Sequence, residues 1–153
     1  MTGRLARLLL TFVMVMLQGC DRGPPRGATL EHLPMSGGGA LPFSAAVRAG
    51  PVLYLSGQLG TDSTLALVPG GIGPETRQAM ENIRAVVTRA GGSMDRIVKC
   101  TVMLADIKEW PAMNQEYVKF FPDRKPARSA LGASGLALNA RVEIECIAAL
   151  EDR

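Results

Sequence analysis

The last regular segment of the chain restricts its fold most. Residues 141–150, RVEIECIAAL, alternate apolar with mostly polar side chains. One face would carry Val142, Ile144, Cys146 and Ala148, and the other Arg141, Glu143, Glu145 and Ile147. A period of two is that of a β-strand with one buried face. The chain is therefore expected to build a sheet that is covered on one side.

Two segments have helical patterns. In residues 74–90, Pro74 suits a first turn and Gly91-Gly92 a stop, and apolar side chains recur at spacings of three and four: Ala79, Met80, Ile83, Val86, Val87 and Ala90. Residues 106–121 begin with Asp106 and Glu109 at the spacing of a capping box, and their apolar side consists of Met113, Tyr117 and Phe120 or Phe121. Both helices are amphipathic, so we expect them to pack on a flat layer.

The remaining strands are short. We predict strands over 43–48 and 52–56, joined by the turn Ala49-Gly50-Pro51, and another near 129–133. Residues 97–104 should form a strand with one face made of Val98, Cys100, Val102 and Leu104. The order ββαβαββ indicates an α+β sandwich with both helices on one face of the sheet. The second face, apolar in part, is expected to be buried by other subunits.

Composition fits one domain. The chain has 153 residues, of which 47% are hydrophobic and only 5% aromatic, so its core should consist of small aliphatic side chains. The formal charge is +3, and without residues 1–19, which hold Arg4 and Arg7, it is 15 minus 14, or +1. Nothing in this charge indicates a nucleic-acid surface, and no nucleic-acid partner is expected.

Residues 1–19 are predicted to be a lipoprotein-type signal peptide. A basic start precedes the apolar run 8–17, which is too short to span a membrane but suits a secretory signal. The ending Leu17-Gln18-Gly19-Cys20 resembles a bacterial lipobox, in which Cys20 is lipidated and becomes the first mature residue. We expect an exported, periplasmic lipoprotein that touches the membrane only through this anchor. The alternative is an uncleaved hydrophobic start with an incidental cysteine.

Residues 20–40 are rich in Gly and Pro and show no period, so they are interpreted as a tether before a folded domain over 41–153. His32, the only histidine, falls in this tether and is expected to be an exposed loop residue. The folded part therefore offers no Ser/His/Asp or Cys/His arrangement and no histidine-based metal site, and we expect no metal.

Cys100 and Cys146 fall on apolar strand faces. We interpret them as buried free thiols that behave as small hydrophobes. A disulfide is an alternative if the protein reaches an oxidising compartment, and a reactive nucleophile is a third.

Arg128 and Glu143 are the candidate chemical groups. A planar guanidinium can hold a carboxylate through two parallel hydrogen bonds, and a carboxyl group can orient water and transfer protons. From the residue types alone, a structural ion pair at a subunit interface and a catalytic pair remain equally open.

Several blocks of sequence together carry a family resemblance. PFSAAVRAG, VLYLSGQ, ETRQAMENI, IVKCTVMLAD, MNQEYVKFF, PARSALGASGL and RVEIECIA occur in the order and spacing of the Rid (reactive intermediate deaminase, YjgF-like) family, from residue 42 to 150. The resemblance implies a chorismate-mutase-like α+β fold with a mixed sheet, a homotrimer, and active sites in clefts between subunits.

The resemblance also implies an activity. Similar proteins hydrolyse enamines and imines such as 2-aminoacrylate to 2-keto acids and ammonia, with no metal or organic cofactor. On the matching motifs, Arg128 would bind the substrate carboxylate and Glu143 would orient water, while Ser56, Gly57 and Asn114 would line the cleft. Imines already hydrolyse in water, so positioning and modest acid/base assistance are sufficient. With this pattern, the catalytic interpretation of Arg128 and Glu143 is favoured.

Two cleft positions depart from the family pattern. Phe43 stands where many deaminases have tyrosine, and Ala130 stands where cysteine or threonine is frequent. These changes bear on the substrate and on the rate. Two other functions therefore stay open: a module that binds a small carboxylate in the same cleft without turnover, and a surface-tethered trimer whose clefts are vestigial.

Overall fold

The computed structural model describes residues 27, 29–35 and 41–151. The predicted signal peptide and Cys20 lie outside the described residues. Among those that are described, no helix is long and apolar enough to cross a membrane. The helices and strands follow one another as β1 (Leu30–Leu33), β2 (Ala46–Ala49), β3 (Val52–Leu55), β4 (Gln58–Leu59), α2 (Ile72–Arg89), β5 (Ile97–Leu104), α3 (Trp110–Tyr117), β6 (Ala127–Gly132) and β7 (Val142–Ala149).

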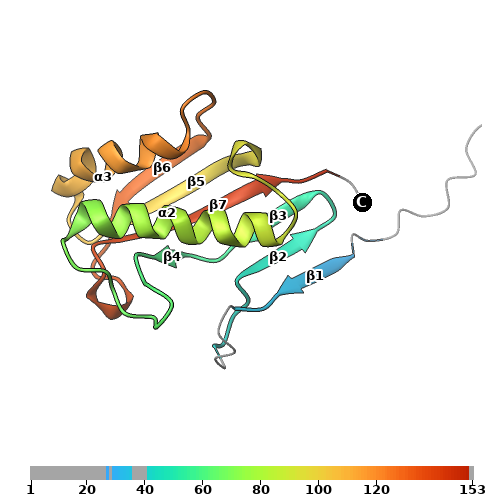
Figure 1. Cartoon of the computed structure of the whole chain (residues 1–153), viewed down its shortest axis with the longest axis horizontal. Coiled ribbons are helices and arrows are strands. Elements are labelled where there is room, and N and C mark those ends of the chain that lie inside the picture. Colours follow the sequence, from blue (N-terminus) through green and yellow to red (C-terminus); the bar gives the residue numbers. More distant parts are fainter. Residues whose placement is uncertain (1–26, 28, 36–40, 152–153) are drawn as a thin grey trace, which may run out of the picture.

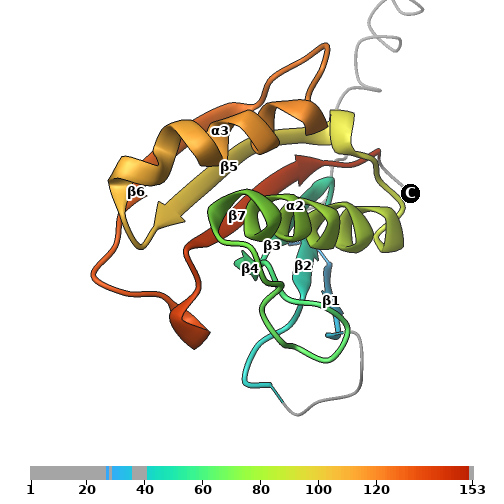
Figure 2. The same ribbon diagram turned by 60° about the vertical axis from the view of Figure 1, so that its left-hand side comes forward.

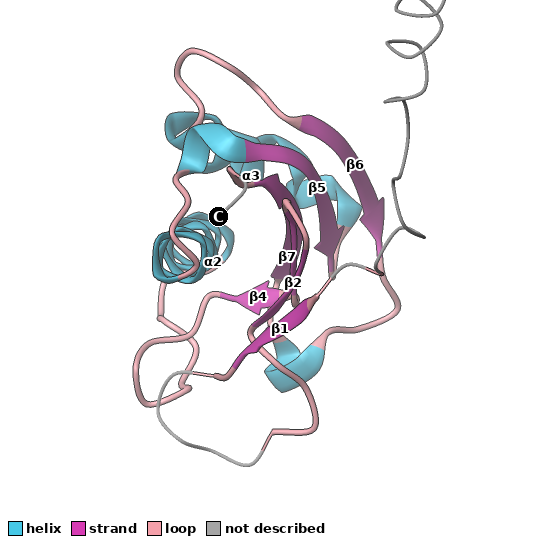
Figure 3. Cartoon of the chain, turned by 90° about the vertical axis from the view of Figure 1, so that its right-hand side faces the viewer, coloured by secondary structure: helices cyan, strands magenta, loops and turns pink. Residues whose placement is uncertain are grey.

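The strands form one mixed sheet in the order β1-β2-β3-β7-β5-β6, with β4 also paired to β7. Only the β5–β6 pair is parallel among these pairings. Helices α2 and α3 lie on the same face of this sheet (Figures 1 and 3). The predicted α+β class and the placement of both helices are confirmed.

Strand β7 lies inside the sheet, and its alternation is as predicted. Val142, Ile144, Cys146 and Ala148 are all buried beneath the helices. Helix α2 packs on this face through Ala79, Met80, Ile83, Val86 and Val87, and Gly91 follows it with φ of 84°. A positive φ suits glycine at the end of a helix, so the predicted stop is also confirmed.

Strand β5 has the predicted bounds, but one residue of the predicted buried face is wrong. The pairing with β7 is irregular between Ile97 and Lys99, so Ile97 is buried and Val98 is 48% exposed. Such a bulge adds one residue and reverses the alternation on one side of it. Cys100, Val102 and Leu104 remain buried as expected.

The predicted tether contains a strand. Leu30–Leu33 pairs antiparallel with β2 and forms an edge of the sheet, with Leu33 buried. Four residues are too few to show a period, so the sequence pattern does not mark this strand. His32 is exposed as expected, although it lies in the strand rather than in a loop.

The second helix is shorter than predicted. Residues 110–117 are α-helical, and short 3₁₀ helices lie on either side at Ile107–Glu109 and Val118–Phe120. Asp106 accepts a hydrogen bond from the Lys108 N–H at 2.9 Å, as a cap does. Glu109 instead binds the Arg141 guanidinium, so the predicted capping box does not close.

Cys100 and Cys146 form a disulfide. They are directly opposed in the β5–β7 ladder, with Cα atoms 4.1 Å apart. The preference for free thiols is therefore wrong. The two cysteines are 46 residues apart in sequence, and only the register between β5 and β7 brings their thiols together on the buried face.

We expect the disulfide to contribute about 4 kcal/mol to the free energy of unfolding, because it closes a long loop of the unfolded chain. In urea unfolding, a reductant should lower the midpoint of the wild type and leave the Cys100→Ala/Cys146→Ala variant unchanged. Two titratable thiols at these positions in folded protein purified without reductant would contradict the bond.

Candidate functional site

Arg128 lies under helix α3. It is the second residue of β6 and pairs with Cys100 of β5, so its side chain is on the face that the helices cover. Its Nη1 donates a hydrogen bond to Asn114 Oδ1 at 2.7 Å. The guanidinium carbon lies 4.7 Å from the centre of the Tyr117 ring and 5.5 Å from that of the Trp110 ring. Helix α3, which runs along this side of the sheet in Figure 2, thus surrounds Arg128 with three side chains.

Glu143 lies on the opposite, uncovered face. Its neighbours Val142 and Ile144 point to the buried face, so strand alternation directs Glu143 away from the helices. A Cβ at position 57 would overlap the Glu143 Oε1 atom, so only glycine lets the carboxyl group lie against this backbone. Burial, together with the nearby charge of Glu145, raises the pKa of Glu143.

Ser56 lies near Glu143, because it is the chain neighbour of Gly57, which the Glu143 carboxyl group contacts. Its hydroxyl donates to the Ser44 carbonyl at 2.7 Å and is thereby committed to the backbone. Phe43 precedes Ser44 and is 51% exposed, which makes its ring available to a partner. The predicted residues Ser56, Gly57 and Glu143 are thus close to one another through their chain neighbours and direct contacts.

Ala130 lies near Arg128 in the same strand. It lies two residues further along β6 and packs, partly buried, against the core. The predicted site residues therefore divide into two groups: Arg128, Asn114 and Ala130 around α3 and β6, and Ser56, Gly57 and Glu143 around β4 and β7.

Within the described residues, Arg128 and Glu143 form no ion pair. Strand β5 separates β6 from β7, and Glu143 is opposite Met103 whereas Arg128 is opposite Cys100. Because they also point to opposite faces, their side chains cannot meet inside one chain. An ion pair or a shared substrate would require Glu143 from another subunit.

The pattern-based interpretation missed the role of Trp110 and assigned Tyr117 only to an apolar helix side. A signal was present, since positions 110, 114 and 117 recur at spacings of four and three and so share a helix face. The Tyr117 side chain is buried, which raises its pKa to about 12 against the opposing effect of Arg128. Its hydroxyl makes no hydrogen bond within the described part of the chain.

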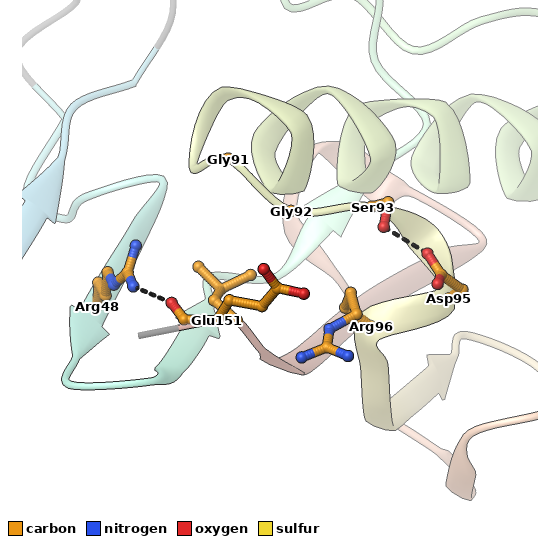
Figure 4. A pocket seen from close by; sticks show the side chains of 8 residues that line it. Arg48, Gly91, Gly92, Ser93, Asp95, Arg96 and Glu151 are labelled. Carbon is orange, nitrogen blue, oxygen red and sulfur yellow. Dashed lines mark hydrogen bonds between the residues drawn. The ribbon is translucent and has the colours of Figure 1, made fainter. Parts of the chain in front are cut away.

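A separate polar hollow of about 490 Å³ lies where the C-terminal end of β7 meets the end of α2 (Figure 4). Arg48 donates from Nη2 to the Glu151 carbonyl at 2.7 Å, and Arg96 donates from Nε to the Ala149 carbonyl at 2.9 Å. These arginines fasten the end of β7 to β2 and to the turn before β5. The hollow contains none of the predicted site residues, and we assign it a structural role.

The described residues contain no group of three or more His, Cys, Asp or Glu side chains arranged to hold a metal ion. The groups around Arg128 and Glu143 offer a fixed guanidinium and a carboxyl group with a raised pKa.

Residues 38–150 match the sequence model of the family described as Endoribonuclease L-PSP. The chain belongs to this family, that of the Rid proteins. Its sequence is 44% identical over 108 residues to the 2-iminobutanoate/2-iminopropanoate deaminase of Capra hircus, covering 70% of this chain and 79% of the relative. For the mouse (Mus musculus) protein of the same name, the identity is 41% over 108 residues, with coverage of 70% and 80%.

Solved structures agree with this Rid assignment. Yeast Mmf1 superposes with a TM-score of 0.73 at 34% identity, covering 80% of this chain and all of Mmf1. Escherichia coli TdcF, solved with bound serine, gives a TM-score of 0.70 at 27% identity, with coverage of 82% and 99%. The predicted family and its fold are both confirmed.

The raised pKa of Glu143 gives this Rid protein a testable pH dependence. The folded state holds the proton more tightly than the unfolded chain, so Glu143 lowers stability as the pH rises from the ordinary glutamate value through its own. Glu143→Gln should therefore melt higher than the wild type at pH 7, and the difference should shrink at pH 4. The exposed neighbour supplies the control, since Glu145→Gln should show a smaller difference. An equal or larger effect of Glu145→Gln would contradict the assignment.

Proposed function

We propose that this Rid protein is an imine deaminase that hydrolyses 2-imino acids, such as the tautomer of 2-aminoacrylate, to 2-keto acids and ammonia. The observation that carries the proposal is the environment of Arg128, which among the described residues consists of an amide and two rings and includes no carboxylate partner. A guanidinium held in this way is suited to binding the carboxylate of a ligand. The names of the relatives in goat and mouse support the same reaction.

In the proposed reaction, Arg128 binds the substrate carboxylate through two parallel hydrogen bonds. The Glu143 carboxylate accepts a proton from water as the oxygen adds to the imine carbon. That proton passes to the imine nitrogen and gives a carbinolamine. The hydroxyl proton of this intermediate then passes through Glu143 to the same nitrogen, the C–N bond breaks as the C=O bond forms, and ammonia leaves behind a 2-keto acid. A carboxyl group whose pKa is raised toward the working pH transfers protons in both directions more readily than an ordinary one.

The site is proposed to form between subunits of a homotrimer. Arg128 and Glu143 face opposite sides of the sheet, so one substrate can meet both only if two chains contribute. The uncovered face carries apolar side chains on β2, β3 and β7, among them Val47, Val52, half-exposed Tyr54 and Ile147. Such a face is typical of a surface that another subunit buries.

Single substitutions should separate the two roles. Arg128→Lys keeps the charge but loses the planar two-bond grip, so we expect KM to rise about tenfold or more. Glu143→Gln should still bind 2-oxobutanoate, while kcat for 2-iminobutanoate falls about 100-fold. Steady-state kinetics with imines generated in situ measures both, with Glu81→Gln, in the surface pair with Arg84 on α2, as the control. Wild-type kinetics in either variant would remove the role assigned to that residue.

Mixed oligomers test the shared site. If each site takes Arg128 from one chain and Glu143 from its neighbour, co-expressed Arg128→Lys and Glu143→Gln chains should regain about one quarter of the wild-type activity, because random assembly restores both residues in that share of sites. Separately expressed variants mixed only during the assay, without subunit exchange, are the control. Mixed oligomers no more active than the two pure variants, or a stable monomer in light scattering, would refute the shared site.

A carboxylate-binding module without turnover is the second candidate. Phe43 supplies no hydroxyl near Ser56, and Ala130 supplies no polar atom on the face of Arg128, so the site has few groups to assist catalysis. Thermal stabilisation by 2-oxobutanoate in a protein that does not accelerate imine hydrolysis would favour this function.

We further propose that the protein is an exported lipoprotein anchored through Cys20. The support is the sequence alone: the basic start, the short apolar run and the Leu-Gln-Gly-Cys ending. Metabolic labelling with a fatty acid tests this, because the label and membrane association should be present in the wild type and absent in Cys20→Ser.

A further inference from the structure

The guanidinium of Arg128 lies against two aromatic rings of one helix. Tyr117 is 96% buried and Trp110 is 38% exposed, with ring centres 4.7 and 5.5 Å from the guanidinium carbon. Asn114, between them on α3, accepts a hydrogen bond from Nη1 at 2.7 Å. Positive charge is attracted to the face of an aromatic ring, and Trp is the strongest partner. These contacts fix both the plane and the rotation of the guanidinium.

The same contacts leave one edge of Arg128 available. Its Nε and Nη2 have no hydrogen-bond acceptor within residues 27, 29–35 and 41–151, whereas Nη1 is engaged by Asn114. Nε and Nη2 together form one of the two edges with which an arginine binds a carboxylate through parallel hydrogen bonds.

Arg128 donates its hydrogen bond to an amide, that of Asn114, and not to a carboxylate. This difference affects the charge that Arg128 can offer to a ligand. A carboxylate in its place would form an ion pair with Arg128 and compete with a ligand carboxylate. An amide orients the guanidinium and leaves its charge uncompensated. The rings likewise stabilise the charge without supplying a counter-ion.

We propose that Trp110, Tyr117 and Asn114 are positioning residues that hold Arg128 flat and present its Nε–Nη2 edge to the substrate carboxylate. The identity of the carboxylate rests on the proposed function, whereas the arrangement around Arg128 does not. A side chain that is fixed before binding loses less freedom when the ligand arrives, so the cluster should act mainly on ligand affinity.

The fluorescence of Trp110 can report ligand binding, because Trp110 is the only tryptophan in the sequence and its ring contacts Arg128, the proposed ligand-binding residue. Titration of the full-length protein with 2-oxobutanoate should change the tryptophan emission in the wild type, and Arg128→Lys should need about tenfold more 2-oxobutanoate, or a larger excess, for the same change. The same titration gives a Kd that does not depend on turnover.

Four variants test the cluster in imine hydrolysis. Trp110→Leu should raise KM about fivefold, the equivalent of about 1 kcal/mol, with kcat within about twofold of the wild type. Trp110→Phe should recover most of this loss. Tyr117→Leu removes the ring that Arg128 contacts and should raise KM by a similar factor. Asn114→Asp should abolish 2-oxobutanoate binding while the melting temperature is kept or raised, a combination that a purely structural residue would not give.

Arg84→Gln is the matched control. It removes a second contact between a guanidinium and a ring, 4.8 Å from Phe120, and should leave KM unchanged. Normal KM in Trp110→Leu, or normal 2-oxobutanoate binding in Asn114→Asp, would overturn the proposal. So would a rise in KM that merely follows a fall in melting temperature.

The outcomes separate this inference from the proposed function. A wild type that binds 2-oxobutanoate through Arg128 but does not hydrolyse imines refutes the deaminase, and the cluster is then tested by the Kd of Asn114→Asp, which keeps Trp110. A wild type that turns imines over normally with unperturbed cluster variants refutes the cluster alone. Absence of any 2-oxobutanoate binding in the wild type refutes the cluster as proposed.

Discussion

The pairing of β7 with three other strands determines the arrangement of this domain. Through its ladders with β3, β4 and β5, the alternation of one segment decides which residues of its neighbours face the helices. The same register places Cys146, Cys100 and Arg128 in one row across three strands. Glu75 of α2 accepts a hydrogen bond from the Arg141 N–H at 2.8 Å and so ties the helix to the start of β7.

This arrangement keeps the two chemical groups apart within the chain. Arg128 lies beneath α3 and Glu143 lies on the uncovered face, so neither neutralises the other. Glu143 instead lies near Glu145, and the repulsion adds to burial in raising its pKa. A structural ion pair inside the subunit would have removed both the positive charge and the basicity that the proposed reaction needs. The proposed reaction therefore needs both features: the two groups stay apart within one subunit, and another subunit covers the face that carries Glu143.

The contacts of Arg128 differ from those of five other arginines, of which Arg84 also lies over a ring but pairs with Glu81. Arg77 and Arg141 pair with Glu116 and Glu109, and Arg48 and Arg96 bind backbone carbonyls. Arg128 combines one amide acceptor with two ring faces. Carboxylate pairing satisfies a cation, whereas this environment orients one and leaves it able to attract an anion.

The sequence by itself determined the long, strongly periodic elements. Residues 97–104 and 142–149 each cover enough positions to show their period, and α2 has both a clear apolar stripe and a glycine stop. The blocks of family sequence also predict Arg128, Glu143 and Asn114 as site residues, and these assignments stay predictions. Local pattern was sufficient for the two strands and the helix because each pattern lies within a short stretch of chain.

Only the tertiary structure decided what depends on register and on contacts between distant segments. Strand β1 gains its hydrogen bonds from β2, the bulge at Val98 arises from pairing with β7, and the disulfide needs Cys100 and Cys146 to be opposed. That Trp110 and Tyr117 lie against Arg128 follows from the packing of α3 beside β6. The opposite orientation of Arg128 and Glu143 follows from the register of two strands on either side of β5, which no single segment of sequence contains.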